Sequence, residues 1–378
     1  MKRDGSLQKT KYCSSKLMKE PNLKKAGILA LMIVVIVISC WEAYLRTSGV
    51  PIDYDDGPEL WSDKRAMVYE PIDRETVFIG SSRNKYDIDI DTWKSITGEY
   101  AIQLSVEGNS PLPVLDDLAD DENFKGKLIV DVTERLFFST LGNNIDEPAE
   151  YVAYYKKQTP AQHFSFLVNH FLEDKFVFLD KGFLSLNSML SKLPVPKRKG
   201  KSFEPFEYPF EASRIKFNRQ NYMMEKFIAD TVLQNHVKTI WEFYEKRNKE
   251  APASGNKLDS FFTAIKTSCD KIKERGGKVL FLRTPSSGYY WEIETKNFPR
   301  EKYWNQLLAY TNCPGIHFKD YVSTASLICP ETSHLGPEQA IYFTKNFIQI
   351  LNEQKLWNFP YKQIALNNLN IKTKNYGF

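Results

Sequence analysis

The fold of this chain is decided by residues 76–83, which have the sequence TVFIGSSR. Residues 76–79 form a short, apolar, β-branched run that ends at Gly80, so the pattern predicts a buried strand followed by a tight turn. Further apolar runs lie downstream, at residues 100–104, 127–131, 278–282 and 316–318. Helical stretches lie between or after them, at residues 113–121, 258–272 and 337–351. Strands that alternate with helices indicate a parallel sheet covered on both faces, a three-layer α/β/α domain over residues 76–358.

Residues 136–257, between the third and fourth predicted strands, do not follow this alternation. They are rich in Phe and Tyr, and they include a basic loop at 197–201 and a linker near 251–255. We expect a mostly helical insertion that packs over the edge or the mouth of the sheet. The basic loop is interpreted as solvated surface, with a contact to anionic glycan or lipid headgroups as the alternative. Residues 359–378 are expected to form a C-terminal tail.

Composition excludes several classes of protein. The chain has 378 residues, of which 42% are hydrophobic and 26% charged, unlike a collagen, a low-complexity polymer or a mostly disordered protein. Its length allows two domains, or one large domain with an insertion. Eight Lys and Arg against two acidic residues give residues 1–25 a net charge of +6, so the rest carries −2 of the total of +4. No nucleic-acid partner is expected, because a nucleic-acid-binding protein carries its basic stripe on the folded domain.

A candidate membrane anchor follows the basic tail. Residues 26–41, AGILALMIVVIVISCW, contain no charge, and residues 43–45 extend the stretch to about the 20 residues that span a bilayer. We predict one transmembrane helix over residues 26–45, because a helix satisfies its own backbone hydrogen bonds in lipid. Cations lie before it and acidic residues after it, so the positive-inside rule predicts a cytoplasmic tail at 1–25 and a periplasmic or extracytoplasmic main domain. Residues 46–75 are expected to form an extended stalk with a short helix near 58–68.

Two alternatives to an uncleaved anchor are open. Residues 37–40, VISC, resemble a bacterial lipobox, which would make Cys40 a lipidated N-terminus, and the segment also resembles a cleaved signal peptide with a poor cleavage site. The long basic segment and the apolar residues beyond Cys40 favour the uncleaved anchor. With this topology Cys269, Cys313 and Cys329 lie outside the membrane, either as free thiols or with one disulfide, for which Cys313–Cys329 is the nearest pair in sequence.

Three polar clusters, at residues 80–83, 107–110 and 331–335, follow predicted strands or precede the last predicted helix. Active sites of open α/β sheets form at the carboxyl ends of the strands. Ser82 lies in a strand-to-helix turn, which exposes its hydroxyl. A glycine such as Gly108 lets its backbone N–H approach a ligand closely, and the next residue, Asn109, offers a neutral side-chain donor. Both suit a negatively charged oxygen, although each cluster alone is also compatible with an ordinary turn.

Glu331 precedes His334 by three residues, a spacing that allows its carboxylate to accept a hydrogen bond from the imidazole Nδ1–H. The Nε2 atom of His334 is then left to face a nucleophile. We therefore take Ser82, His334 and Glu331 as candidate catalytic residues, and Gly108 and Asn109 as candidate oxyanion donors. No metal and no cofactor is expected, because the chain has no HExxH motif, no paired Cys/His ligand spacing and no phosphate-binding glycine loop.

Three blocks, FIGSSR at 78–83, LSVEGNS at 104–110 and ETSHL at 331–335, resemble those of the SGNH, or GDSL-type, hydrolase superfamily. The resemblance covers residues 76–351, interrupted by the insertion. It implies a flavodoxin-like sheet, with the serine at the end of the first block as nucleophile and the histidine of the last block as base. It also implies that the glycine of the second block is a backbone oxyanion donor.

The chain departs from this family pattern at three positions. Ser81 stands where the first block usually has Asp, and Glu331 stands where the last block usually has Asp. The asparagine that the family has after its third strand is missing, since residues 131–135 are DVTER. The candidates to replace this side-chain donor are Asn109, Thr133 and Arg135. Loss of one such donor typically lowers the rate by about 10²–10³.

The resemblance implies a serine esterase or O-acyltransferase that acts on acyl esters, with acetyl esters foremost, of a cell-surface polysaccharide. Membrane-anchored bacterial relatives, such as those of alginate O-acetylation, act on such polymers. The alternative is a catalytically idle SGNH-like subunit that binds or assembles within a cell-envelope complex. A lipid esterase is a third hypothesis, because the Phe and Tyr content is compatible with either a glycan or a lipid substrate.

Overall fold

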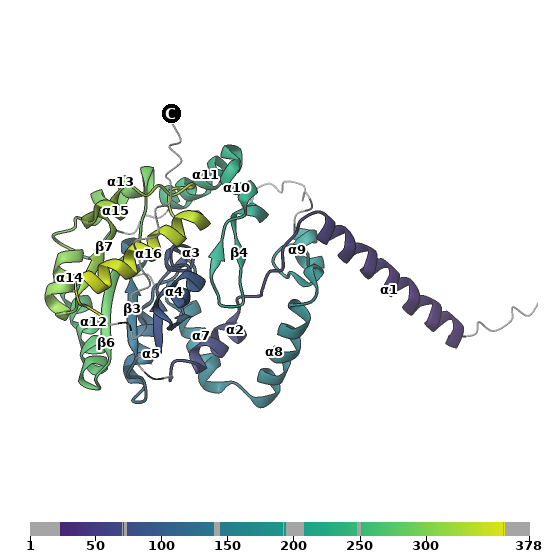
Figure 1. Ribbon diagram of the computed structural model, residues 1–378, viewed down its shortest axis with the longest axis horizontal. Coiled ribbons are helices and arrows are strands. Elements are labelled where there is room, and N and C mark those ends of the chain that lie inside the picture. Colours follow the sequence, from purple (N-terminus) through teal and green to yellow (C-terminus); the bar gives the residue numbers. More distant parts are fainter. Residues whose placement is uncertain are drawn as a thin grey trace, which may run out of the picture. The chain divides into compact units, whose positions relative to one another are not determined.

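The computed structural model describes residues 23–359 apart from 70, 72–73, 140–143, 192, 194–207, 248–250 and 358. The chain divides into two units, residues 1–51 and residues 52–378 (Figure 1). Most of the expected cytoplasmic tail, the basic loop at 197–201 and nearly all of the C-terminal tail lie outside the described residues.

The first unit contains one long helix, α1 (Leu23–Thr47). At a rise of about 1.5 Å per residue, a helix of 25 residues extends about 38 Å, more than the roughly 30 Å of a bilayer's hydrocarbon core. Its apolar side chains are almost all exposed rather than packed in a protein core. The helix is therefore long and apolar enough to cross a membrane, and it includes the predicted span at 26–45.

A five-stranded sheet forms the centre of the second unit. Its order is β2-β1-β3-β6-β7, and every neighbouring pair is parallel. The strands are β1 (Glu75–Ile79), β2 (Tyr100–Gln103), β3 (Lys127–Asp131), β6 (Lys278–Arg283) and β7 (Gly315–His317). All five were predicted, and no predicted end differs from the observed one by more than one residue. The α/β class with a parallel sheet is therefore confirmed.

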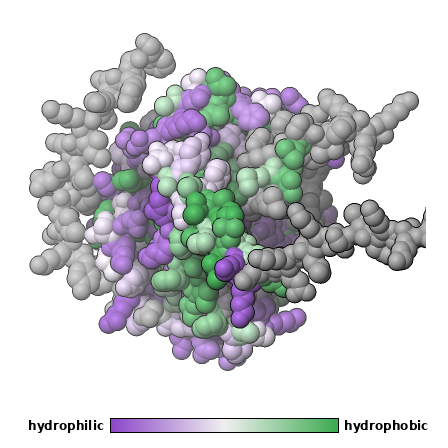
Figure 2. Space-filling view, turned by 90° about the vertical axis from the view of Figure 1, so that its right-hand side faces the viewer, coloured by the Kyte–Doolittle hydropathy of each residue, from purple (hydrophilic) through white to green (hydrophobic). Residues whose placement is uncertain are grey.

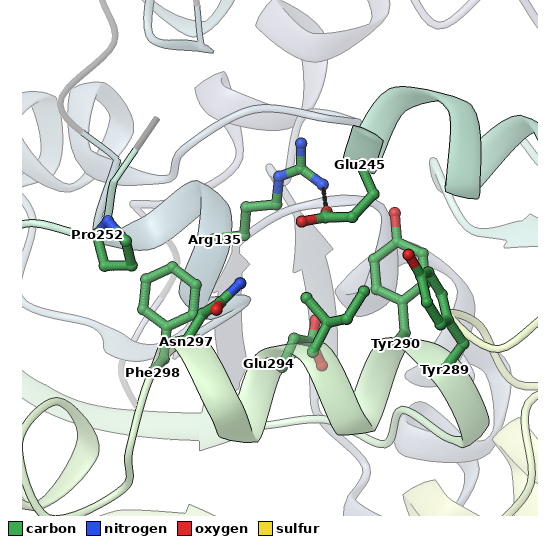
Figure 3. Close-up of a pocket in the computed structure, with 9 residues that line it drawn as sticks. Arg135, Glu245, Pro252, Tyr289, Tyr290, Glu294, Asn297 and Phe298 are labelled. Atoms are coloured by element: carbon green, nitrogen blue, oxygen red, sulfur yellow. Dashed lines mark hydrogen bonds and ion pairs between the residues drawn. The ribbon is translucent and has the colours of Figure 1, made fainter. Parts of the chain in front are cut away.

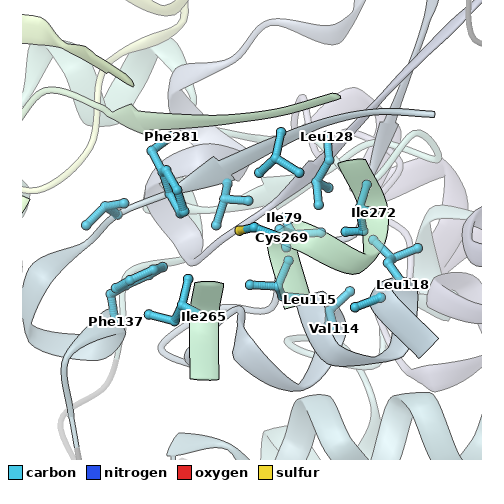
Figure 4. Close-up of a cluster of buried hydrophobic side chains, with 14 of the residues drawn as sticks. Ile79, Val114, Leu115, Leu118, Leu128, Phe137, Ile265, Cys269, Ile272 and Phe281 are labelled. Carbon is cyan, nitrogen blue, oxygen red and sulfur yellow. The ribbon is translucent and has the colours of Figure 1, made fainter. Parts of the chain in front are cut away.

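Helices cover both faces of this sheet (Figure 1). Side chains alternate along each strand, so Val77 and Ile79 enter one hydrophobic cluster whereas Phe78 enters another. The first cluster, shown in Figure 4, includes side chains from α2 (Pro58–Ala66), α5 (Leu112–Asp120), α7 (Asp146–Lys157), α12 (Asn256–Glu274) and α14 (Trp304–Thr311). The second includes side chains from α4 (Ile90–Thr97) and α16 (Pro337–Glu353). Burial on both faces explains why the strands are continuous apolar runs.

Local signals place the ends of several helices. Helix α4 begins where the Asp89 side chain accepts a hydrogen bond from the Thr92 N–H at 2.7 Å, and it ends at Gly98, whose φ is +72°. Helix α16 begins at Pro337. Proline suits the first position of a helix, because a backbone N–H at that position would have no acceptor within the helix and its absence costs nothing. Shorter helices are α3 (Ser82–Asp87), α13 (Gly288–Asn297) and α15 (Val322–Ala325).

The insertion between β3 and β6 is mostly helical, as predicted. Besides α7 it contains α6 (Glu134–Phe137), α8 (Pro160–Glu173), α9 (Leu186–Ser191), α10 (Glu225–Ala229) and α11 (Thr231–Arg247). It also contains an antiparallel hairpin of β4 (Arg214–Ile215) and β5 (Asn221–Tyr222), which the sequence analysis did not predict. Strands of two residues are too short to show an alternating pattern.

The prediction of an extended stalk over residues 46–75 is wrong from residue 52 onward, because these residues belong to the second unit. Helix α2 was predicted within it, but this helix packs into the second unit. Trp61 is fully buried, and its indole N–H donates to the Leu104 carbonyl at 2.9 Å. Arg65 forms a buried ion pair with Asp117 at 2.8 Å. Because these contacts are specific and buried, the segment is part of the folded domain.

The four described cysteines are free thiols. Cys269 and Cys313 lie in the first hydrophobic cluster, whereas Cys329 lies in the second, on the other face of the sheet. The sheet therefore separates Cys313 from Cys329, and the fold does not favour the pair that is nearest in sequence.

Replacement of Trp61 by Ala tests whether the segment after α1 belongs to the domain. We expect the free energy of unfolding to fall by about 3–5 kcal/mol, because a large buried side chain is lost and a cavity is left. Denaturant unfolding of the full chain in detergent, followed by circular dichroism, would measure the change. The control is Met67→Ala, at a residue that is 40% exposed directly after the same helix. A Trp61→Ala effect as small as that of the control would contradict the packing.

Candidate active site

The polar clusters meet at the carboxyl edge of the sheet. Ser82 is the first residue of α3, three residues after the end of β1, and His334 lies three residues before α16. The Oγ atom of Ser82 and Nε2 of His334 are 2.8 Å apart, although 252 positions separate the two residues in the chain. The loop after β2 lies against the same edge, because the N–H of Val106 donates to the Gly80 carbonyl at 3.1 Å. The fold thus brings together two side chains that the sequence analysis proposed as nucleophile and base.

Glu331 contacts the other side of the His334 imidazole. Its Oε1 lies 2.5 Å from Nδ1 and also accepts the His334 backbone N–H at 2.8 Å. Burial raises the pKa of Glu331, but the imidazole of His334 and hydrogen bonds from Trp241 and Ser333 outweigh it and hold this pKa below its ordinary value. An ionised carboxylate only accepts hydrogen bonds, so Nδ1 carries the proton and Nε2 is free to accept the Ser82 hydroxyl proton. The three side chains form a serine–histidine–glutamate relay.

Two aromatic side chains hold this relay in place. Trp241, on α11 of the insertion, donates its indole N–H to Glu331 Oε2 at 2.6 Å. The Tyr86 ring lies 4.5 Å from the His334 ring, measured between centroids, and its hydroxyl donates to the Ala212 carbonyl at 3.1 Å. The sequence analysis missed both residues. No local motif marks Trp241, which lies 90 positions before its partner, and Tyr86 has the pattern of an ordinary core aromatic residue.

Two backbone N–H groups are candidates for an oxyanion hole, those of Ser82 and Gly108. Neither makes a hydrogen bond within the part of the chain that the structure describes. Gly108 has a φ of +66°, a conformation that favours glycine, and it is exposed. The preceding residue, Glu107, accepts hydrogen bonds from Lys85 at 2.7 Å and from Asn221 at 2.5 Å. These contacts tie the glycine loop to the domain.

Asn109 is not available as an oxyanion donor, which corrects the expectation from the sequence. Its side-chain amide donates to Glu147 Oε2 at 2.8 Å and to the Glu107 carbonyl at 2.7 Å, which occupies both N–H groups. Its backbone N–H donates to the Val106 carbonyl at 3.3 Å. The side chain therefore joins the loop after β2 to α7 of the insertion.

The other two candidates for the missing side-chain donor are also engaged. The Thr133 hydroxyl lies 2.7 Å from the Ser81 hydroxyl and donates to Asp131 Oδ2 at 3.0 Å. Arg135 forms an ion pair with Glu245 of α11. Ser81, which stands in place of the family's usual aspartate, thus links the end of β1 to the end of β3.

A buried ion network lies next to Ser82. Arg83 and Arg283 share the carboxylate of Glu294, at 2.5 Å and 2.6 Å, and Arg283 also pairs with Glu134 at 2.7 Å. Burial raises the pKa of Glu294, but the two guanidinium groups outweigh it and lower this pKa below its ordinary value. Because Arg83 directly follows Ser82, the network fixes the first turn of α3. The sequence analysis did not predict it, since its members come from four separate elements.

A cavity of about 140 Å³ lies beside this network (Figure 3). The side chains around it come mainly from α13, with contributions from α6 and α11. Its wall includes Tyr289, Tyr290, Glu294, Asn297, Phe298, Pro252 and the Arg135–Glu245 ion pair. The ring of Tyr290 is 6.3 Å from that of Trp241, the residue that donates to Glu331. One aromatic side chain therefore contacts both the relay and the cavity wall.

This arrangement suits nucleophilic chemistry at a carbonyl carbon. A hydroxyl, an imidazole and a carboxylate in series allow the hydroxyl to lose its proton as it attacks. Among the described residues, no group of three or more His, Cys, Asp and Glu side chains is arranged to hold a metal ion.

Comparison of the sequence with known families and curated proteins assigns the chain to no family. No family model matches the chain, and no curated protein matches its sequence. Inference of its function therefore depends on the side-chain geometry of the site and on the fold.

Glu294→Gln is expected to lower the free energy of unfolding by about 3–5 kcal/mol, because two buried guanidinium groups lose their shared negative charge. Denaturant unfolding at neutral pH would measure this change. Glu292→Gln, at an exposed position of the same helix, is the matched control and should have little effect. Equal stability of the two variants would contradict the importance of the network.

The effect of Glu294→Gln should also depend on pH. The pKa of Glu294 is lower in the folded protein than its ordinary value, so the ionised carboxylate stabilises the fold above that ordinary value. This stabilisation is lost as the pH falls through the folded-state pKa. The difference in unfolding free energy between the wild type and Glu294→Gln should therefore shrink on acidification, whereas the Glu292→Gln difference should stay small throughout.

Proposed function

We propose that this protein is a membrane-anchored serine esterase or O-acyltransferase of the SGNH type, acting on acyl esters, acetyl esters foremost, of a cell-surface polysaccharide. One observation carries the proposal. Ser82 Oγ lies 2.8 Å from His334 Nε2, and His334 Nδ1 lies 2.5 Å from Glu331 Oε1. Three side chains in this order activate a serine for acyl transfer on several unrelated folds.

The reaction begins when Ser82 Oγ attacks the ester carbonyl carbon and its proton passes to His334 Nε2. The carbonyl π electrons move to oxygen, and this oxyanion is bound by the N–H groups of Ser82 and Gly108. The tetrahedral intermediate expels the alcohol, which takes the proton from His334, and an acyl-serine is left. Water or a sugar hydroxyl then gives its proton to His334 Nε2 as its oxygen attacks the acyl carbon. The second tetrahedral intermediate breaks its bond to Ser82 Oγ, which takes the proton back from His334, and the acid or the new ester is released. Water makes the protein an esterase, and a sugar hydroxyl makes it a transferase.

The topology of the sheet supports the SGNH assignment. Counted along the sheet's own strands, the order β2-β1-β3-β6-β7 is 2-1-3-4-5, which is the flavodoxin-like order. In sheets of this order, ligands bind where the strand order reverses, at the carboxyl ends of the first and third strands. Ser82 lies three residues after the first strand ends, and the Ser81–Thr133 hydrogen bond joins the segments that follow these two strands.

The cavity and the membrane helix support the choice of substrate. The cavity of about 140 Å³ is lined by Tyr289 and Tyr290 together with polar and charged side chains. Aromatic and polar groups side by side suit contact with part of a sugar. By the positive-inside rule, the basic residues before α1 predict a cytoplasmic N-terminus, and with that topology the domain would face the periplasmic or extracytoplasmic space.

A second candidate function is a catalytically idle SGNH-like subunit of a cell-envelope complex. One observation favours it: Asn109, Thr133 and Arg135 are all engaged elsewhere, so the site lacks the side-chain oxyanion donor of the family. Two backbone donors are left. An active enzyme with this site would bind its oxyanion with the N–H groups of Ser82 and Gly108. A third hydrogen bond would come from a hydroxyl group of the substrate or from a water molecule.

Ser82→Ala is expected to abolish both labelling by a fluorophosphonate and release of acetate from an aryl acetate, with a rate loss of about 10⁴-fold or more. The physical reason is the loss of the only hydroxyl bonded to His334 within the described residues. Ser81→Ala is the matched control, because the neighbouring serine faces Thr133 instead, and this variant should still be labelled. A wild-type chain that resists the reagent would favour the idle subunit, and equal labelling of Ser82→Ala would exclude Ser82 as nucleophile.

Glu331→Gln is expected to lower kcat by up to about 10⁴-fold, because the amide favours the wrong tautomer of His334. Each carboxylate oxygen of Glu331 accepts hydrogen bonds from N–H groups. In either orientation of the glutamine side chain, its NH₂ group would therefore face another N–H donor and could not form a hydrogen bond with it. Steady-state kinetics with an aryl acetate would measure the loss. Glu338→Gln, at an exposed position on α16, is the control and should retain wild-type turnover. Full activity of Glu331→Gln would rule out the proposed role of the carboxylate.

A further inference from the structure

Helix α8 packs on the second unit along one face. Phe166 is buried, and the imidazole of His170 stacks on the Phe217 ring with centroids 3.8 Å apart. Glu173, near the end of the helix, is also buried. These side chains recur at a spacing of four and three residues, so they lie on the same side of the helix.

The opposite face of α8 is apolar and exposed. Four side chains at positions i, i+3, i+4 and i+7 form one stripe, and we call them the exposed α8 stripe. They are Phe164, Leu167, Val168 and Phe171, which expose 68%, 46%, 43% and 63% of their surface. Met189 and Leu190 of α9 are also exposed. Figure 2 views the molecule from the side on which α8 and α9 lie in Figure 1, and the members of the stripe are identified by their exposed fractions.

Exposure of such an apolar stripe to water is unfavourable in free energy. A contiguous apolar surface on a folded domain marks a contact with a partner or a membrane more often than a feature of the free protein. The helix begins with a capping box at Thr159 and Gln162, and its other face already packs on the unit through Phe166 and His170. The stripe therefore needs an explanation other than folding.

The chain itself limits how far α8 can lie from a bilayer that contains α1. Thr47 ends α1, and Asp53, six residues later, pairs with Arg214 in the second unit at 3.4 Å. Six residues reach about 20 Å at most. The next residue, Tyr54, donates its hydroxyl to Asp174 at 3.0 Å, and Asp174 directly follows α8. Whatever the orientation of the two units, the end of α8 is tethered close to the point where α1 leaves the membrane.

We propose that the exposed α8 stripe lies in the interfacial region of the bilayer that α1 crosses, as a second and peripheral membrane contact. Phe and Leu side chains on one face are typical of helices that lie in this region, buried about 5–10 Å into the boundary between headgroups and acyl chains. The four side chains of the stripe carry no charge, so no desolvation of a charge opposes their insertion. The inference depends on α1 being a membrane anchor and not on the proposed reaction.

The contact would orient the active-site domain relative to the membrane. A single helix with a six-residue connection leaves a domain free to rotate, whereas a second contact at α8 restricts that rotation. A substrate polymer on the membrane surface would then meet a domain held in one orientation.

Photo-crosslinking of the full chain in vesicles of phosphatidylethanolamine and phosphatidylglycerol tests the proposal. The photoreactive residue p-benzoylphenylalanine replaces Phe164, Val168 or Phe171 in separate variants, and mass spectrometry identifies the adducts. We expect phospholipid adducts at all three positions. The control position is Val322, which is 96% exposed and should give none. It belongs to α15, a helix that lies on the side of the unit opposite to α8 in Figure 1. Asn169, exposed on α8 but outside the stripe, should give fewer adducts than Phe171.

A second variant separates insertion from mere proximity. The substitutions Phe164→Gln, Leu167→Gln and Phe171→Gln remove the apolar character of the stripe, and the photoreactive residue stays at position 168. Lipid adducts at 168 should then be lost, while the unfolding midpoint in detergent stays unchanged because the replaced side chains are exposed. Adducts between two copies of the chain, no adducts at α8, or full retention of lipid adducts in the Gln variant would overturn the proposal.

Discussion

The site depends on one buried carboxylate. Glu331 is fully buried, and an ionised group in that position is tolerated only if hydrogen bonds replace the water that it has lost. Its two oxygens accept four N–H groups, from the His334 ring, the His334 and Ser333 backbone, and the Trp241 indole. Three of these donors lie within three residues of Glu331, but the indole comes from α11 of the insertion. The insertion therefore contributes a side chain to the candidate active site rather than being an appendage to the sheet.

Ion pairs also stabilise the part of the site formed by α3 and the glycine loop. Asp56, four residues after the start of the second unit, pairs with Arg219 of the insertion at 2.5 Å and with Lys85 of α3. Lys85 in turn pairs with Glu107, the residue before the glycine that is the backbone oxyanion candidate. The segment that enters the domain after α1, the first turn after the nucleophile and the glycine loop are thus joined by one chain of ion pairs. A segment expected to be a passive stalk instead supports the edge of the sheet where the reaction is proposed to occur.

Much of the architecture could be predicted because its signals are local. The strands at 76–79 and 127–131 are apolar on both faces, bounded by turn residues, and the helix at 337–351 has one apolar face. The pairing of His334 with Glu331 also lies within one short motif. Trp241, Glu294 and Arg283 could not be assigned, because a buried ion pair or indole contact has no sequence period and its partners are far apart in the chain. The role expected for Asn109 failed for the same reason, since its amide meets Glu147, a residue 38 positions away in the insertion.

The amino-acid sequence by itself determined the alternation of strands and helices, the apolar segment long enough to span a membrane, and the residue types at the end of β1 and before α16. These features depend on hydrophobic periodicity and turn chemistry, which act over a few neighbouring residues. Only the tertiary structure decided that Ser82 and His334 meet, that residues 52–69 join the domain, and that the apolar stripe of α8 is left exposed. These outcomes depend on packing between segments that are distant in the chain, where burial and the pairing of charges select the partners.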